Sequence, residues 1–267
     1  MSKSVYSTDH AESVLSTHRW RTVSNSAAYV LPYLQDDIKI LDIGCGPGSI
    51  TVDLAKRVPN GHVTGIETES DPLEEGQKLA EHEGVKNVTF EVADAHKLSY
   101  EDDTFDIVHA HQVLQHVGDP VKVLTEMRRV VKPGGIVACR ESAMPAWYPA
   151  SKGIEMADDL FRRMSRDRGG NPHPGSHIHM WAQQAGFERS QITCTTGSWC
   201  FSSPDERAYW GGSNAARAES SGLAKTAVDK GYATASELTE MVKAWHEFVN
   251  NDNAWYAILH GEMVCRK

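Results

Sequence analysis

The sequence predicts an α/β protein in which helices cover both faces of a mostly parallel sheet. Over the first half of the chain, short runs rich in β-branched residues alternate with helical stretches, the pattern of strands joined by crossover helices. The first of these runs leads through a glycine-rich turn directly into a helix. With 267 residues, of which 40% are hydrophobic, the chain can form one large domain or a core with a smaller lobe.

Five strands are expected in the first half. They are residues 38–43, 62–67, 88–92, 106–110 and 136–140. The helix after the first strand carries Ile50, Leu54 and Val58 on one face. The helix before the fifth strand directs Leu124 and Met127 inward in the same way. These apolar faces indicate helices that pack on a buried sheet.

The second half departs from this repeat and is rich in aromatic residues. Strand-like runs return at Thr193–Phe201 and Trp255–Cys265, which brings the expected sheet to seven strands. The first 35 residues contain two apolar patterns, one around Val14 and Leu15 and one from Trp20 to Leu31, and we expect two helices there.

Charge and composition restrict the partners. The chain carries 27 Lys and Arg against 36 Asp and Glu, a net charge of −9, so nucleic acid would be repelled. Apolar runs fall far short of the ~20 residues of a membrane span, and no apolar leader opens the chain. We therefore expect a cytoplasmic protein that binds a small molecule. The sequence does not predict its oligomeric state.

No metal site is predicted. The 5 cysteines lack metal-ligand spacing, and they fit a reducing compartment. His173, His177 and His179 lie in or beside a loop rich in proline and glycine, without an acid or cysteine at supporting spacing. We interpret these histidines as solvated or at the rim of a pocket.

The glycine turn suggests a nucleotide-type ligand. Glycines at 44, 46 and 48 give the pattern G-x-G-x-G, whereas dinucleotide sites use G-x-G-x-x-G. Asp42 lies two residues before Gly44. This arrangement resembles the motif of class I S-adenosylmethionine (SAM) methyltransferases, which have a Rossmann-like seven-stranded sheet. The resemblance implies that Asp42 faces the methionine ammonium and that Gly44 and Gly46 pack against the nucleoside.

Two further acids follow later strands. Glu67 and Thr68 come at the end of the second strand, where the family binds the ribose, and Asp94 and Ala95 follow the third, where it binds adenine. Any one acid in such a place is usually a loop residue or helix cap. Three acids after three successive strands favour SAM, with S-adenosylhomocysteine as product. A dinucleotide oxidoreductase and a catalytically silent SAM-binding protein remain the alternatives.

A closer resemblance covers about residues 10–142. The runs 105–117, 119–120 and 126–135 are similar to motifs of the ubiquinone/menaquinone C-methyltransferase-like group, and Trp20-Arg21 resembles a pair that precedes its sheet. On this basis Arg21 either binds the cofactor carboxylate or caps a surface acid. We divide the chain into N-terminal helices that close the cofactor cleft (1–35), the SAM-binding core (36–142), an acceptor-binding or lid region that includes the sixth strand (143–252) and a last antiparallel strand (253–267).

Two histidines are the candidate catalytic residues. His111 follows the fourth strand beside the expected sulfonium, and His116 lies one helical turn later. Either side chain could take a proton from a hydroxyl or thiol acceptor. The alternatives are a cofactor contact for His111 and a packing role for His116.

The acceptor is expected to be a small apolar metabolite of secondary metabolism, because the lid region is aromatic. Residues 13–22 and 25–27 resemble microbial enzymes that include fungal S-methyltransferases of gliotoxin-type dithiols. We favour a thiol acceptor for this reason, with C- or O-methylation of a quinol or phenol as the alternative.

Overall fold

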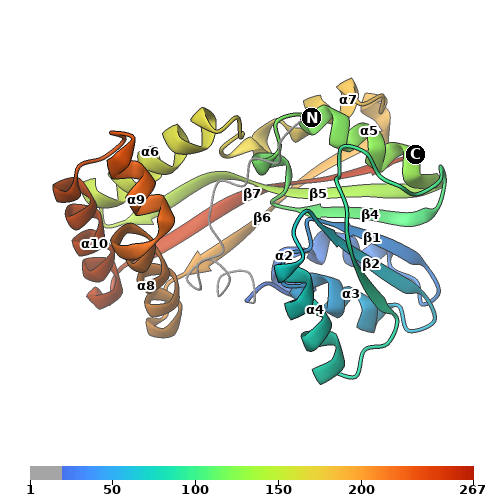
Figure 1. The fold of residues 1–267 in the computed structure, drawn as a ribbon, viewed down its shortest axis with the longest axis horizontal. Coiled ribbons are helices and arrows are strands. Elements are labelled where there is room, and N and C mark those ends of the chain that lie inside the picture. Colours follow the sequence, from blue (N-terminus) through green and yellow to red (C-terminus); the bar gives the residue numbers. More distant parts are fainter. Residues whose placement is uncertain (1–19) are drawn as a thin grey trace.

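The computed structural model describes residues 20–267 and contains a seven-stranded sheet of order β3-β2-β1-β4-β5-β7-β6 (Figure 1). All neighbouring strands from β3 to β5 are parallel, and β7 runs antiparallel to both β5 and β6. The strands are β1 Lys39–Ile43, β2 His62–Glu67, β3 Val88–Val92, β4 Phe105–His111, β5 Val131–Tyr148, β6 Ile192–Phe201 and β7 Trp255–Arg266. The predicted Rossmann-like fold class is confirmed.

Helices cover both faces of the parallel part of the sheet. Helices α3 (Ser49–Arg57) and α4 (Asp71–His82) lie below it in Figure 1, and α5 (Pro120–Val130) and α7 (Ile178–Gln184) lie above it. One apolar core fills each side, with Leu54 and Val63 in one and Leu124 and Met127 in the other, all fully buried. The predicted inward faces of these helices are correct.

The fifth strand is far longer than predicted. We expected residues 136–140, but β5 begins at Val131, passes the Pro-Gly-Gly segment with a register shift, and continues to Tyr148. Its last residues pair with the start of β7, where Tyr148 lies opposite Trp255. Pro145 argues against a strand in the sequence, because proline cannot donate a ladder hydrogen bond. The pairing with β7 overrides that local signal.

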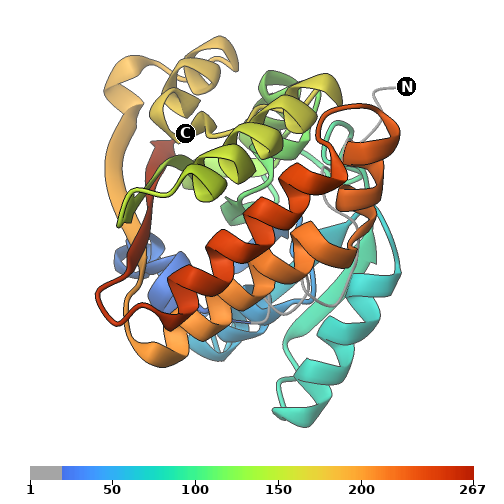
Figure 2. The same ribbon diagram turned by 90° about the vertical axis from the view of Figure 1, so that its left-hand side faces the viewer.

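A helical layer packs on this extended part of the sheet. It consists of α6 (Lys152–Asp167), α8 (Pro204–Ser220), α9 (Gly222–Asp229) and α10 (Ala235–Asn250). Figure 2 shows α8 and α10 lying side by side. A third apolar cluster joins them to the strands, with Trp245 and Phe248 of α10 against Phe201 and Tyr256. We call residues 143–148, 198–201 and 255–260 the sheet extension.

The N-terminal prediction is only partly correct. Residues 20–35 form a short helix α2 (Val23–Ser26) and a 3-10 helix η1 (Ala28–Tyr33) instead of one continuous α-helix. Pro32 lies inside η1, and proline removes a backbone donor that a longer α-helix would need. The other predicted helix, around Val14 and Leu15, lies outside the described residues.

Further 3-10 turns are η2 (Leu114–His116), η3 (Pro174–Ser176) and η4 (Arg189–Gln191). Within residues 20–267, no helix is long and apolar enough to cross a membrane.

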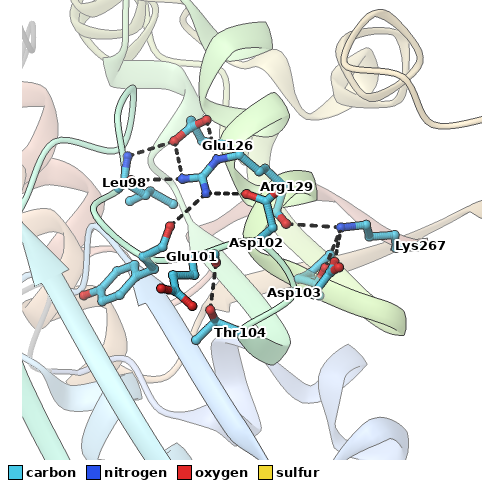
Figure 3. A network of polar contacts seen from close by, with 10 residues as sticks. Leu98, Glu101, Asp102, Asp103, Thr104, Glu126, Arg129 and Lys267 are labelled. Carbon is cyan, nitrogen blue, oxygen red and sulfur yellow. Dashed lines mark hydrogen bonds and ion pairs between the residues drawn. The ribbon is translucent and has the colours of Figure 1, made fainter.

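Arg129 fastens the end of α5 to the loop before β4 (Figure 3). Its guanidinium donates to both carboxylate oxygens of Glu126 and to the Asp102 carboxylate. It also donates to the carbonyl oxygens of Leu98 and Tyr100. Figure 3 shows this network beside Lys267 at the end of β7. The planar guanidinium of arginine suits such a multiple contact, because its donors are fixed in one plane.

We predict that Arg129→Met destabilises the fold by about 2 to 3 kcal/mol, because the largely buried Glu126 then loses its cationic partner. Denaturant unfolding monitored by circular dichroism measures the change. The control is Lys243→Met, which removes an exposed ion pair with Glu247 and should cost less than about 0.5 kcal/mol. Equal losses for the two variants would contradict the structural role of Arg129.

Candidate active site

A cavity lies at the carboxyl ends of β1, β2 and β4, the edge at which open α/β sheets bind ligands. It contains about 950 Å³ of empty space, part of it open to solvent. We call it the first cavity. Its lining includes each residue predicted to bind cofactor or to act in catalysis, namely Arg21, Asp42, Gly44, Gly46, Glu67, Thr68, Asp94, Ala95, His111 and His116.

The glycine turn presents bare backbone to this cavity. Gly44, Gly46 and Gly48 all have positive φ, at 63°, 54° and 77°. A Cβ at position 44 would lie 2.5 Å from a methyl carbon of Val113, and one at position 48 would lie 2.8 Å from the Phe90 ring. Only glycine fits this path, which leaves the turn able to contact a ligand through its backbone.

The acids that follow β2 and β3 are fixed by hydrogen bonds at the cavity wall. Glu67 accepts the backbone N–H of Gly46 at 3.2 Å and that of Thr68 at 2.9 Å. One carboxylate oxygen of Asp94 accepts the backbone N–H of His96 at 2.9 Å and lies 2.7 Å from Nδ1 of the same histidine. Partial burial alone would raise the pKa of Asp94, but these His96 hydrogen bonds outweigh it and lower the pKa. Both carboxylates are therefore oriented before any ligand binds.

Asp42 is buried in the floor of the cavity, where it binds two neighbours. One carboxylate oxygen accepts the Thr51 hydroxyl at 2.6 Å, and the other lies 2.7 Å from Nδ1 of His109. His109 is opposite Asp42 in the register of β4 on β1, and the sequence analysis did not identify it. The pair joins two strands directly beneath the glycine turn.

Arg21 and the two candidate histidines meet at the inner end of the cavity. The Nη1 atom of Arg21 lies 3.5 Å from Nδ1 of His111, whose side chain is buried. Burial lowers the pKa of His111 well below its usual value, and the nearby Arg21 and Arg140 lower it further. Burial and Arg21 also lower the pKa of His116 to about 4. Both rings are thus neutral near pH 7.

A second cavity opens beyond these residues, between the sheet extension and the helical layer. It shares Arg21, Gln112 and His116 with the first cavity, and it contains about 1250 Å³ of empty space, also partly open to solvent. Its aromatic lining consists of Trp199 and Tyr256 from the sheet and Phe161, Trp210 and Trp245 from the helices.

Glu141 is a further site residue that the sequence analysis missed. It is fully buried in β5, directly after the part of that strand that pairs in parallel with β4. Its carboxylate accepts the backbone N–H groups of Val113 at 2.8 Å and Leu114 at 2.6 Å. It therefore holds the segment that carries Gln112 and His116. The rule that identified Glu67, an acid at a strand end, applies equally to Glu141, which directly follows the strand expected at residues 136–140.

The three histidines of the Gly/Pro-rich region separate in space. His173 lines the second cavity, whereas His177 and His179 belong to the lining of neither cavity. In the part of the chain that the structure describes, no cluster of three His, Cys, Asp or Glu side chains could hold a metal ion.

Comparison with known proteins identifies the family. A family model described as "Methyltransferase domain" matches residues 34–185, more than half of the chain. The chain belongs to this family. An uncharacterized methyltransferase of Schizosaccharomyces pombe is 36% identical over 204 residues, covering 73% of each chain. The "Probable methyltransferase ltbC" of Aspergillus luteorubrus is 32% identical over 281 residues, covering 98% of this chain and 97% of the relative.

Similarity to other methyltransferases is more local. Demethylmenaquinone methyltransferase of Staphylococcus aureus is 45% identical over 109 residues, covering 40% of this chain and 44% of the relative. The resemblance to the menaquinone group is therefore supported for part of the chain. The family and the glycine-turn motif together identify this protein as a SAM-dependent methyltransferase.

Solved structures confirm the fold. The YcgJ protein of Bacillus subtilis superposes with a TM-score of 0.57 at 18% identity, covering 90% of this methyltransferase and 97% of that chain. Phosphoethanolamine N-methyltransferase 2 of Haemonchus contortus, solved with S-adenosylhomocysteine, gives a TM-score of 0.55 at 18% identity. The match covers 90% of this chain and 52% of that chain. The [4+2]-cyclase SpnF gives a TM-score of 0.52 at 21% identity, and the match covers 93% of this chain and 80% of that chain. Because these identities are low, the likeness shows the fold alone.

The burial of Glu141 predicts a pH-dependent stability. Burial raises its pKa to about 8 from an ordinary value of 4.5, although the amide hydrogen bonds oppose the shift. Between these pH values the folded state holds a proton that the unfolded state releases. The contribution of Glu141 to the unfolding free energy should therefore fall as pH rises from about 4.5 to 8 and change no further above that range.

Glu141→Gln should remove this contribution, so that the variant gains stability relative to the wild type by a few kcal/mol as pH rises across that window. Urea unfolding at several pH values measures the difference. Glu247→Gln, at an exposed residue, is the matched control. Parallel curves for wild type and Glu141→Gln would contradict the raised pKa.

Proposed function

We propose that the first cavity binds SAM and that the second holds a small apolar acceptor, which is methylated where the two cavities meet. The observation that supports this most strongly is the shared wall formed by Arg21, Gln112 and His116. An in-line methyl transfer needs donor and acceptor in one continuous space with the reacting atoms about 3 to 3.5 Å apart. The two adjoining cavities fit this requirement.

The residues of the first cavity suit the chemistry of SAM. Gly44 and Gly46 line the cavity with bare backbone, against which a nucleoside would pack. Glu67 would accept the ribose hydroxyls beside Thr68, and Asp94 and Ala95 would bind the adenine. Asp42 contributes negative charge toward the methionine ammonium, while Arg21 would pair with the methionine carboxylate. When bound, SAM supplies an electrophilic methyl group on a sulfonium.

The two histidines are better suited to positioning the reactants than to acting as a general base. With pKa values far below neutral, His111 and His116 are uncharged at physiological pH and offer lone pairs, but they hold a proton poorly. We propose that they orient the acceptor and the cofactor by hydrogen bonding. Exclusion of water and alignment of the reactants then supply most of the rate, as positioning alone can.

This reasoning supports an acceptor that ionises easily. A thiol with an ordinary pKa near 8.5 yields some thiolate at neutral pH without a strong base. The thiolate charge also disappears against the sulfonium in a site with little water, which favours the transfer. We therefore propose S-methylation of a thiol or dithiol of the gliotoxin type. C- or O-methylation of a quinol or phenol is the second candidate, and the aromatic lining of the second cavity supports it.

We predict that Glu67→Ala weakens SAM binding by about 1.5 to 3 kcal/mol, the usual contribution of a hydrogen bond to a charged acceptor. Isothermal titration calorimetry measures the loss. Glu67→Gln keeps an acceptor oxygen for the Gly46 amide and should lose less, which separates ligand binding from support of the turn. Glu69→Ala, two residues away on the exposed surface, is the control and should bind like the wild type. Unchanged affinity in Glu67→Ala would exclude the ribose role.

The acceptor is tested by incubating the enzyme with SAM and either reduced gliotoxin or a demethyl quinol. Mass spectrometry should find one or two added methyl groups on the dithiol. Methylation of the quinol with the dithiol untouched would disprove the sulfur assignment and leave the cofactor site intact. If labelled methyl reaches no compound of a broad extract although SAM binds, the protein is a silent SAM-binding protein.

A further inference from the structure

A strip of polar side chains crosses the second cavity, whose lining also contains aromatic, aliphatic and other polar residues. It begins at His116, where the two cavities meet, and continues through Gln115 and Ser142 to His173 and Asp158. Each of these residues lines the cavity, and they come from the segment after β4, from β5, from the loop before η3 and from α6. Four separate chain segments thus contribute to one line of polar groups.

We propose that this strip, centred on the His173–Asp158 pair, is a specificity site for a second hydrogen-bonding group of the acceptor, remote from the methylated atom. The acceptor class is a small aromatic or similarly flat molecule that carries a hydroxyl or N–H donor in addition to the methylated group. This inference rests on the proposed placement of the acceptor in the second cavity. It adds the requirement that the acceptor carries a second polar group, which methyl transfer alone does not impose.

The contacts within the strip are continuous. Nε2 of His173 lies 3.2 Å from Oδ1 of Asp158, and its Nδ1 lies 3.2 Å from Oγ of Ser142. The Ser142 hydroxyl donates to Oε1 of Gln115 at 3.1 Å. The amide nitrogen of Gln115 lies 3.2 Å from Nε2 of His116. A group bound at the His173 end is therefore linked to the junction at which we place the reaction.

Asp158 is a carboxylate placed in an apolar surrounding. Its side chain is only 10% exposed, and its second oxygen binds Arg162, which does not line the cavity. A carboxylate offers about four lone-pair positions, and these two contacts leave capacity for a donor from the cavity. The ion pair with Arg162 offsets the cost of burying this charge, so that Asp158 can present it to a ligand in the cavity.

The backbone supports the same conclusion. Gln112 and His173 are non-glycine residues with positive φ, at 55° and 58°, and both line the second cavity. In the described part of the chain, the only other residue of this kind is Asp103. Such conformations cost free energy and are concentrated at binding sites, where the surrounding structure enforces them. The fold thus holds His173 in the cavity at the expense of local backbone strain.

Two thiols of nearly equal size distinguish the proposal from a purely apolar cavity. 4-Mercaptophenol carries a hydroxyl where 4-methylbenzenethiol carries a methyl group. A site built to bind a hydroxyl rejects an analogue without it, because buried polar groups are then left unpaired. We expect the wild type to bind 4-mercaptophenol at least about tenfold more tightly. Quenching of the cavity tryptophans, with S-adenosylhomocysteine present to prevent turnover, measures both dissociation constants.

The decisive variant is Asp158→Asn, which keeps the shape of the side chain and removes its charge. The ratio of the two dissociation constants should fall to within about threefold in this variant. Asp159→Asn is the matched control, because Asp159 is the next residue of α6 and forms an exposed ion pair with Arg163. If Asp158→Asn does not fold, as judged by circular dichroism, Ser142→Ala tests the same strip.

The outcomes separate this proposal from the proposed function. Equal binding of the two thiols by the wild type, or equal preference in Asp158→Asn and Asp159→Asn, overturns the specificity site even if both thiols are methylated. The expected preference without methylation of either thiol supports the specificity site and removes the sulfur assignment. Absence of binding by both thiols overturns the inference.

Discussion

Strands β5 and β7 pair from Ile136 opposite Arg266 to Tyr148 opposite Trp255, and both cavities depend on this ladder. Its inner part completes the parallel core and positions Glu141 behind the first cavity. Its outer part continues past the core and forms, with β6, the floor of the second cavity. Without the outer pairing, the helical layer would have no sheet on which to bury its aromatic residues. The β5–β7 ladder, whose register shifts between Ser142 and Met144, thus connects the two sites.

The junction of the cavities combines cations with buried histidines. The guanidinium groups of Arg21 and Arg140 lie 5.3 Å and 5.5 Å from the centre of the Trp199 ring, within the range of cation–π attraction. Burial, together with these positive charges, lowers the pKa of His111 well below its usual value and that of His260 to about 2. A neutral imidazole can accept a hydrogen bond at any physiological pH. The junction is therefore suited to orienting reactants rather than to exchanging protons.

The parts of the site that the sequence predicts are those encoded locally. The glycine turn and the acids after β2 and β3 are each recognised within a few residues, because a strand end and the following loop are continuous in the chain. Glu141 follows the same rule, since it comes directly after the strand predicted at residues 136–140, but its partners Val113 and Leu114 are distant in sequence and give no local signal. The sequence indicates His173 only as solvated or at a pocket rim, and Asp158 not at all, since only the packing of α6 on the sheet extension brings the two residues together.

This difference explains why similarity to relatives identifies the cofactor chemistry more readily than the acceptor. The residues expected to bind the cofactor lie between Arg21 and His116, whereas the second cavity also draws on β5, β6, β7 and the helical layer. Changes in those later elements can reshape the second cavity while the glycine turn stays the same. Because the cofactor site and the acceptor cavity can change separately, one fold of this kind can support several chemistries. The acceptor must accordingly be inferred from the aromatic walls and polar strip of this chain, and these favour a flat molecule with a second polar group.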